Sequence, residues 1–233
     1  MSLDIAIHRS VLIKILKDIY TDSSLGPSLG FKGGTAVYLF YNLNRFSVDL
    51  DFDLLTVDEE GYVFERVKKI LKKYGLVKDA VKKRYNLFFM MAYDDKVPGA
   101  QNIKVEINRR DFGSKYESKS YLGIPVKVMV REDMAAHKLV AMLERIGRTN
   151  RDIYDVFFFL QNDWPINKSI VEARTGLGWN EYLKKVIDKL EKLANRNILA
   201  GMGELLDEKQ KAWVKENLKR EVVFLLKLKL EKE

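Results

Sequence analysis

An alternating acidic run, Ser47-Val48-Asp49-Leu50-Asp51-Phe52-Asp53, constrains the fold of this chain more than any other segment. In a β-strand successive side chains point to opposite faces, so the aspartates share one face and the apolar residues can enter a core on the other. Neighbouring carboxylates would lie about 6.5 Å apart and repel by roughly 2.5 kcal/mol at an effective dielectric constant of about 20. Aspartate is also a poor strand former, so the run predicts either a cation at this face or a solvated acidic edge that discourages strand pairing.

The composition limits which cation could bind there. The 233 residues include no cysteine and only two histidines, His8 and His137. Disulfide scaffolds, cysteine-ligated zinc, thiol catalysis and His-rich metal sites are therefore excluded. Carboxylates would have to hold any metal ion, and Mg²⁺ is the natural candidate for such oxygen ligands.

Hydrophobic periodicity predicts an α+β chain in two parts. Besides the acidic strand at 48–54, strands are predicted at about 84–93, 102–108 and 124–130. Helices are predicted at about 4–20, 33–43, 59–74, 132–146, 150–162, 178–194 and 209–230. We therefore predict a mixed β-sheet flanked by helices in residues 1–130, followed by a C-terminal helical region in residues 131–233.

Two other features bear on the acidic strand. Gly33 and Gly34 precede an apolar helix, where glycine allows close backbone approach and a helix N-terminus offers free N–H groups to phosphate. No Walker A or G-x-G-x-x-G motif accompanies this pair, and most such pairs are only turns. Glu106 would supply a third carboxylate if its strand pairs beside the acidic one; the alternative is a surface residue flanked by Lys104 and Asn108.

Together these segments resemble the nucleotidyltransferase superfamily that includes DNA polymerase β-like enzymes. Its signature is a glycine pair at the start of a helix, then a strand with Asp-x-Asp, then a later strand with a third acidic residue. The runs Lys32–Ala36 and Arg45–Phe52 look more specifically like the AbiEii/AbiGii-type toxins, which are abortive-infection or toxin–antitoxin nucleotidyltransferases. Two later runs, Glu132–Lys138 and Arg148–Asp155, also match, and the resemblance covers roughly residues 30–160.

The resemblance implies a catalytic metal centre and fixes which acids would form it. Asp49 and Asp51 would coordinate Mg²⁺, with two ions expected, and Glu106 would be the third metal-binding and catalytic carboxylate. Many superfamily members have aspartate at this third position, so Glu106 is a mild departure from the pattern. Asp53 lies beyond the core pair and is treated as auxiliary.

The resemblance also implies a nucleotide-binding set and a second acidic cluster. The residues expected to bind the NTP are Lys32, Gly33, Gly34, Thr35, Arg45 and Ser47. Lys138 and Asp152 match catalytic positions, so the helical domain would contribute to the active-site cleft, and Asp155 lies one turn beyond Asp152. Without the family, Lys138 would be an ordinary solvated lysine and the acids an ordinary helix start.

A basic segment accounts for the net charge of the chain. Residues 66–84 contain nine basic residues and one acid, a local charge of +8 that equals the formal net charge of the whole chain. We predict that this segment forms an electrostatic track for RNA, on which Tyr74 and Tyr85 could stack bases. The alternative is a solvated helix face. The residues named for RNA binding are Lys68, Lys69, Lys72 and Lys73.

The sequence thus predicts a Mg²⁺-dependent nucleotidyltransferase that transfers NMP from an NTP to RNA such as tRNA. The resemblance implies the toxin of a toxin–antitoxin or abortive-infection system, with an antitoxin protein as partner. No apolar run approaches the ~20 residues of a membrane helix, so a cytoplasmic protein without a membrane partner is expected. Two alternatives remain: nucleotidylation of a protein or small-molecule hydroxyl, and a catalytically idle nucleotide- or RNA-binding module.

Overall fold

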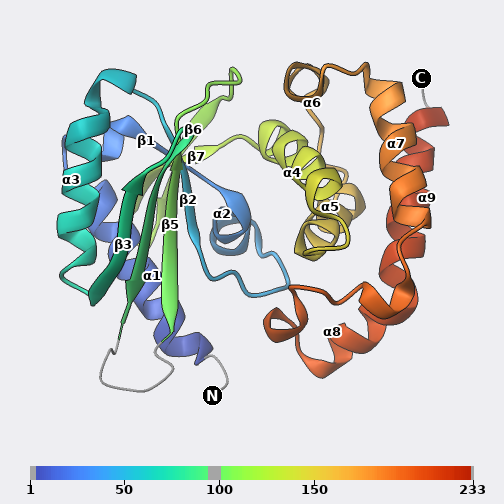
Figure 1. Ribbon diagram of the computed structural model, residues 1–233, viewed down its shortest axis with the longest axis horizontal. Helices are drawn as coiled ribbons and strands as arrows, with labels where there is room; N and C mark the ends of the chain where they lie inside the picture. The colour runs from blue at the N-terminus through green and yellow to red at the C-terminus, as the bar shows by residue number, and fades with distance from the viewer. Residues whose placement is uncertain (1–3, 94–100, 232–233) are drawn as a thin grey trace. The chain divides into compact units, whose positions relative to one another are not determined.

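The computed structural model describes residues 4–93 and 101–231, which form two compact units. The first unit comprises the described residues up to Asp111 together with Lys115–Met129. The second comprises Phe112–Ser114 and the described residues from Val130 onward. Figure 1 shows a sheet with its helices in the first unit and a set of helices in the second.

Among the described residues, a seven-stranded mixed sheet forms the centre of the first unit. The strands are β1 Leu29–Lys32, β2 Leu50–Leu54, β3 Leu76–Lys82, β4 Asn86–Ala92, β5 Asn102–Asn108, β6 Tyr116–Tyr121 and β7 Ile124–Met129. Their order across the sheet is β3-β4-β5-β2-β1-β7-β6. The pairs β2–β5 and β1–β7 are parallel and the others antiparallel, which confirms the predicted mixed sheet.

Helices pack on one face of this sheet, here called the helix face. The helices of the first unit are α1 Ile5–Tyr20, α2 Gly33–Tyr41 and α3 Glu60–Leu71, with 3₁₀ turns at Gly26–Ser28 and Val57–Glu59. Tyr20 of α1 contacts Phe52 of β2, with ring centroids 6.4 Å apart, and Phe64 of α3 contacts Phe89 of β4 at 5.0 Å. Phe52 and Phe89 are fully buried, so the core of the unit lies under α1 and α3 (Figure 1).

The opposite face, here called the acidic face, carries a row of three side chains across neighbouring strands. Asp51 of β2 pairs with Glu106 of β5, and Glu106 pairs with Phe88 of β4. All three side chains are half-exposed. The residues directly before and after each of them in its strand are buried, with their side chains on the helix face. The alternation of apolar and polar residues along each strand therefore places the apolar side chains in the core and leaves these three on the acidic face.

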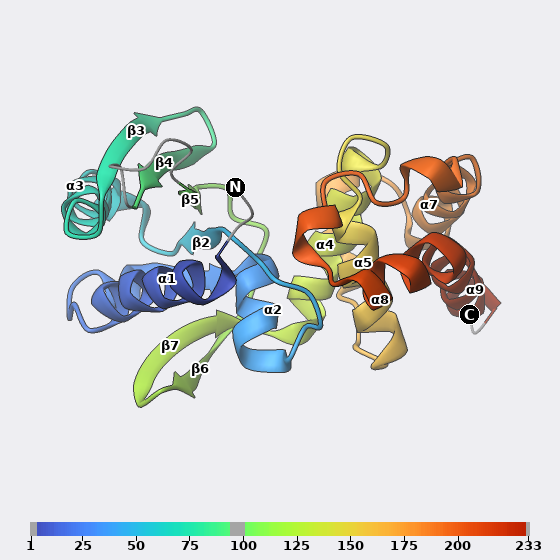
Figure 2. The same cartoon turned by 90° about the horizontal axis from the view of Figure 1, so that it is seen from below.

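The second unit is built from helices. They are α4 Arg131–Arg145, α5 Arg151–Gln161, α6 Lys168–Thr175, α7 Trp179–Glu191, α8 Glu208–Trp213 and α9 Lys219–Glu231, with a π-helical turn at Val214–Leu218 and 3₁₀ turns at Asn195–Asn197 and Gly203–Leu205. α4 packs against α5 and α6. α9 packs against α5 and α7 (Figure 2). Within the described parts of the chain, no helix is long and apolar enough to cross a membrane.

Three strands and one helix of the described residues, β1, β3, β6 and α6, were not predicted from the sequence. β1 has only four residues, one of them glycine, which is too short for a clear alternation. β3 and β6 are the two edge strands, and their side chains are polar or exposed on both faces, so the period-two hydrophobic pattern is absent. α6 has eight residues and buries only Ile170 and Val171.

Candidate active site

Gly33 and Gly34 begin α2 directly at the end of β1, and both positions exclude a side chain. Gly33 has φ +80°, and a Cβ there would collide with the Asp51 carboxylate. A Cβ on Gly34 would lie 2.9 Å from Arg45 Nη2 and 2.9 Å from Ser47 Oγ. The glycine pair therefore does more than allow a turn. It is required because the segment that leads into and forms the acidic strand packs closely against it.

Thr35, Arg45 and Ser47 are buried beside this turn. The hydroxyls of Thr35 and Ser47 are hydrogen-bonded at 2.9 Å, and the Thr35 hydroxyl also donates to the backbone carbonyl of Asp49. Arg45 Nη1 donates to the carbonyl of Phe46 at 2.8 Å. These bonds attach the segment that enters β2 to the start of α2, and direct contact of the three residues with an NTP stays a prediction.

Asp49, Asp51 and Glu106 come from the first unit. Asp49 lies immediately before β2, Asp51 within it, and Glu106 directly opposite Asp51 on β5. The sequence predicted that Glu106 would lie near the aspartates if its strand paired with the acidic strand, and β5 does pair with β2. Asn86 of β4 orients this carboxylate by donating from Nδ2 to Glu106 Oε1 at 2.5 Å.

Lys104, which the sequence identified only as a neighbour of Glu106, lies among these carboxylates. Its Nζ is 3.4 Å from Asp49 Oδ2 and 3.1 Å from Glu106 Oε2. Burial alone would lower the pKa of the Lys104 ammonium, but the charges of Asp49, Asp51 and Glu106 outweigh burial and raise that pKa. The position of Lys104 two residues before Glu106, on the same strand face, is the signal that could have identified it.

The donor set of the acidic face suits Mg²⁺, because carboxylate oxygens are the ligands that this ion prefers. Within residues 4–93 and 101–231, however, no group of three or more acidic or histidine side chains is arranged to hold a metal ion. The ammonium of Lys104 contacts both Asp49 and Glu106 and supplies positive charge where a metal ion would. Coordination by Asp49, Asp51 and Glu106 together stays a prediction.

Asp53, on the same face, is held in a network that joins four strands. Lys32 Nζ lies 2.5 Å from Asp53 Oδ1, and Asn108 Nδ2 donates to the same oxygen at 2.7 Å. The Tyr116 hydroxyl donates to Asp53 Oδ2 at 2.5 Å, and its ring crosses Gly30, where any Cβ would collide with it. Lys32, predicted to bind the NTP, is thus engaged by Asp53 in this structure.

His8 of α1 supports the backbone where the chain enters β2. Its Nε2 donates to the carbonyl of Val48 at 2.9 Å, and its Nδ1 therefore accepts from the Tyr93 hydroxyl at 2.8 Å. Burial lowers the pKa of His8, and the Val48 carbonyl and the Asp49 carboxylate oppose this only in part. The imidazole is therefore neutral and holds the residue next to Asp49 in place.

Lys138 and Asp152 meet in the second unit, in a buried ion cluster between α4 and α5. Lys138 Nζ is 2.6 Å from Asp152 Oδ1 and 2.8 Å from Asp155 Oδ2, and Arg145 Nη1 is 3.2 Å from Asp152 Oδ2. Both aspartates are fully buried. Burial alone would raise the pKa of Asp152, but the charges of Lys138 and Arg145 outweigh it and lower that pKa. A part for Lys138 and Asp152 in catalysis stays a prediction.

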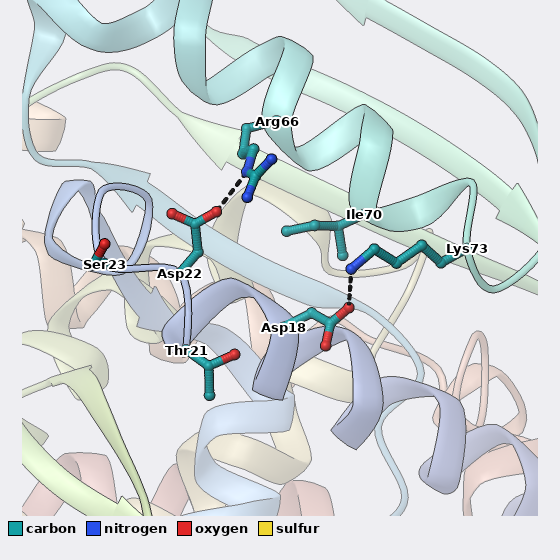
Figure 3. Close-up of a pocket in the computed structure, with 7 residues that line it drawn as sticks. All are labelled: Asp18, Thr21, Asp22, Ser23, Arg66, Ile70 and Lys73. Atoms are coloured by element: carbon teal, nitrogen blue, oxygen red, sulfur yellow. Dashed lines mark hydrogen bonds and ion pairs between the residues drawn. The ribbon is translucent and has the colours of Figure 1, made fainter.

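The basic residues named for RNA binding lie beside the helix face. Lys68 and Lys69 belong to α3, and Lys72 and Lys73 follow it directly, so the acidic face is on the other side of the sheet. A depression of about 320 Å³ lies between α1 and α3 and is shown in Figure 3. Its basic side chains are paired with acids: Arg66 Nε lies 2.5 Å from Asp22 Oδ2, and Lys73 Nζ lies 2.9 Å from Asp18 Oδ2.

Comparison of the sequence with models of known protein families identifies the type of enzyme. The model of the nucleotidyl transferase AbiEii toxins of type IV toxin–antitoxin systems matches residues 14–178. This chain belongs to the AbiEii family. The AbiEii protein described here is therefore a nucleotidyltransferase of a toxin–antitoxin family, and the matched range includes the glycine pair, the acidic strand and Glu106.

Solved structures confirm the fold of this AbiEii protein. The crystal structure of JHP933 from Helicobacter pylori is 24% identical, with 100% of this chain and 95% of that chain covered and a TM-score of 0.67. MenT4, a nucleotidyltransferase toxin from Mycobacterium tuberculosis H37Rv, is 19% identical, with 97% and 93% of the two chains covered and a TM-score of 0.55. None of the curated protein sequences matches this chain.

Proposed function

We infer that this AbiEii protein is a Mg²⁺-dependent nucleotidyltransferase that transfers NMP from an NTP to RNA, with tRNA as the first acceptor to test. Membership of the AbiEii family supports the use of an NTP and the role of a toxin. The observation that carries the inference is the position of Asp51 directly opposite Glu106, against the glycine turn that begins α2.

The start of α2 is the proposed site for the triphosphate. Gly33 and Gly34 carry no side chain, and Lys32, which precedes the helix, makes no side-chain cap to it. Backbone N–H groups at a helix N-terminus, together with the helix dipole, favour phosphate oxygens. Lys32 would exchange part of its contact with Asp53 for the phosphates.

The acidic face is the proposed site of the transfer itself. An acceptor hydroxyl attacks the α-phosphorus, so that a new oxygen–phosphorus bond forms while the bond to the leaving pyrophosphate breaks. Glu106 accepts the hydroxyl proton, and its orientation is set by Asn86 and Lys104. Asp49 and Asp51 would hold Mg²⁺, which when bound neutralises phosphate charge and favours the ionised hydroxyl.

An antitoxin protein is the proposed regulatory partner, and the cytoplasm is the proposed location. The type IV toxin–antitoxin description of the family supports the antitoxin. NTPs and tRNA meet in the cytoplasm, which supports the location. Expression of this chain alone should arrest growth, and coexpression of a neighbouring antitoxin gene should relieve that arrest. Comparing the two would test the partner.

The acceptor is tested by supplying each α-labelled NTP with Mg²⁺ and either total RNA or protein extract. Label on RNA supports the proposal. Label on protein instead would assign the same chemistry to a protein hydroxyl. Retained NTP binding without transfer to either material would indicate a catalytically idle nucleotide-binding module and would overturn the proposal.

A further inference from the structure

The turn between β3 and β4 presents aromatic rings with cations beside them. Tyr85 is 47% exposed, and the guanidinium carbons of Arg84 and Arg110 lie 5.0 and 5.1 Å from its ring centroid. Lys83 Nζ lies 3.7 Å from the centroid of the half-exposed Phe88 ring. Each ring therefore has a positive charge within cation–π distance, and Tyr85 with both guanidinium groups is accessible to a ligand.

Phe88, with Lys83 at its ring, connects the turn to the proposed reaction centre. Phe88 and Glu106 are directly paired on β4 and β5, and neighbouring strands lie about 4.8 Å apart. A base that displaces the Lys83 ammonium from the Phe88 ring and stacks there would bring the hydroxyls of its own nucleotide within reach of the Glu106 carboxylate. Tyr85, three residues before Phe88, would then contact the preceding nucleotide of the same nucleic-acid chain.

The turn is fixed in place by a half-buried arginine. Arg109 forms an ion pair with Glu60 of the 3₁₀–α3 junction, and its Nη2 donates to the carbonyls of Lys83 at 2.5 Å and Arg84 at 2.6 Å. The backbone N–H of Arg109 also donates to the carbonyl of Tyr85 at 2.8 Å. Because these bonds order the turn before any ligand arrives, binding there costs little conformational entropy.

Single-stranded RNA is the partner that such a surface recognises. A duplex hides the faces of its bases, whereas an unpaired end exposes them for stacking on aromatic rings and leaves its phosphates open to adjacent cations. We propose that Lys83, Arg84, Tyr85, Phe88 and Arg110 form a docking surface for the unpaired 3′ end of the acceptor RNA. This rests on the proposed function, and it moves RNA binding from α3 to the β3–β4 turn and the adjoining end of the acidic face.

The first test measures binding of a labelled RNA hairpin with a single-stranded 3′ overhang, beside the same hairpin with a blunt end. Tyr85→Ala should weaken binding of the overhang by about tenfold, since stacking is lost, and Tyr85→Phe should bind normally. Arg84→Ala/Arg110→Ala should reduce the slope of log affinity against log salt by about 1.4, or roughly 0.7 for each lost phosphate contact.

A charge-matched control and a competing surface complete the binding test. Lys184→Ala/Lys185→Ala removes two exposed lysines of α7 and should leave the preference for the overhang unchanged. Lys68→Ala/Lys69→Ala removes two lysines of α3. A loss of overhang binding in the α3 variant, with normal binding by Tyr85→Ala, would overturn the proposed surface.

Transfer kinetics separate a failure of this surface from a failure of the proposed function. Tyr85→Ala should raise KM for RNA about tenfold and change kcat and KM for the NTP by less than about twofold. If the wild type labels RNA and Tyr85→Ala does so with unchanged KM, the surface is wrong and the function stands. If the wild type binds the overhang through Tyr85 but labels no RNA, the surface stands and the function is wrong. No binding of the overhang by the wild type overturns the surface.

Discussion

At the residue scale, one lysine explains how three carboxylates coexist on the acidic face. Without a cation, Asp49, Asp51 and Glu106 would repel one another across neighbouring strands. Lys104 contacts two of them, at 3.4 and 3.1 Å, and its raised pKa keeps it charged. The acidic site is therefore partly neutralised by the protein itself before a metal ion or an NTP binds.

Replacing Lys104 should make the stability of the protein respond more strongly to Mg²⁺. In metal-free buffer, Lys104→Met should lower the free energy of unfolding by about 1–2 kcal/mol, between the values for exposed and buried ion pairs. Mg²⁺ should restore stability more strongly in this variant than in the wild type, which thermal unfolding with and without Mg²⁺ would measure. Lys185→Met, which breaks an exposed pair with Glu181, is the control. An equal response of all three proteins to Mg²⁺ would contradict the expected role.

His8 should make stability depend on pH. Its pKa is lowered in the folded chain, so the unfolded chain binds this proton more readily. The stabilisation is complete above the unfolded pKa of about 6.5 and is lost as pH falls through the folded pKa. Urea unfolding should therefore show a free energy that falls with pH below 6.5 in the wild type and falls less steeply in His8→Gln. Identical slopes would show that the imidazole does not titrate in this way.

At the scale of elements, the junction between β1 and α2 joins the phosphate site to the acidic strand. The helix begins where Gly33 has φ +80° and lies against the Asp51 carboxylate. Thr35, the third residue of the helix, is hydrogen-bonded to Ser47 and to the backbone carbonyl of Asp49. A change in this turn should therefore reach the carboxylates.

Gly33→Ala should reduce NMP transfer at least about tenfold and destabilise the fold by about 1–2 kcal/mol, because alanine is strained at positive φ and its Cβ displaces Asp51. Gly61→Ala in α3 is the matched control, since its Cβ would meet open space. That variant should keep its activity and unfold no more easily. Transfer rates and urea unfolding of both variants check the expectation, which equal activities would refute.

The elements also show what sequence could and could not predict. Asp49 and Asp51 could be predicted as site residues because alternation within one strand is a local pattern, and the glycine pair because it adjoins a predicted helix. The contacts of Lys104 depend on the pairing of β5 with β2, which no local pattern specifies. Edge strand β3 carries exposed side chains on both faces, so no alternating pattern distinguished it within the basic segment.

At the scale of the whole molecule, the basic excess of residues 66–84 is divided between different surroundings. Arg66 and Lys73 are paired with acids beside α1, and Lys82 lies 3.4 Å from Glu60. Lys83 and Arg84 instead adjoin aromatic rings at the β3–β4 turn. A net charge of +8 therefore says little about where a polyanion binds until the partners of each cation are known.

The buried cluster of the second unit allows a structural role to be separated from a catalytic one. Lys138→Met should destabilise the protein by about 3–5 kcal/mol, because it removes the ammonium that contacts both buried carboxylates. Adding Asp152→Asn and Asp155→Asn should restore stability, measured by urea unfolding, without restoring transfer. A stable triple variant with normal transfer would show that Lys138 and Asp152 serve only the fold.

Asp51, opposite Glu106, belongs to the site that we propose transfers NMP to RNA. The most direct measurement is transfer of α-labelled NMP to purified RNA by the wild type, by Asp51→Asn and by Asp58→Asn, which removes an exposed acid outside the site. We predict label on RNA with the wild type and Asp58→Asn, and a loss of at least about 100-fold with Asp51→Asn. Undiminished labelling by Asp51→Asn, or no labelling of RNA by the wild type, would contradict the account.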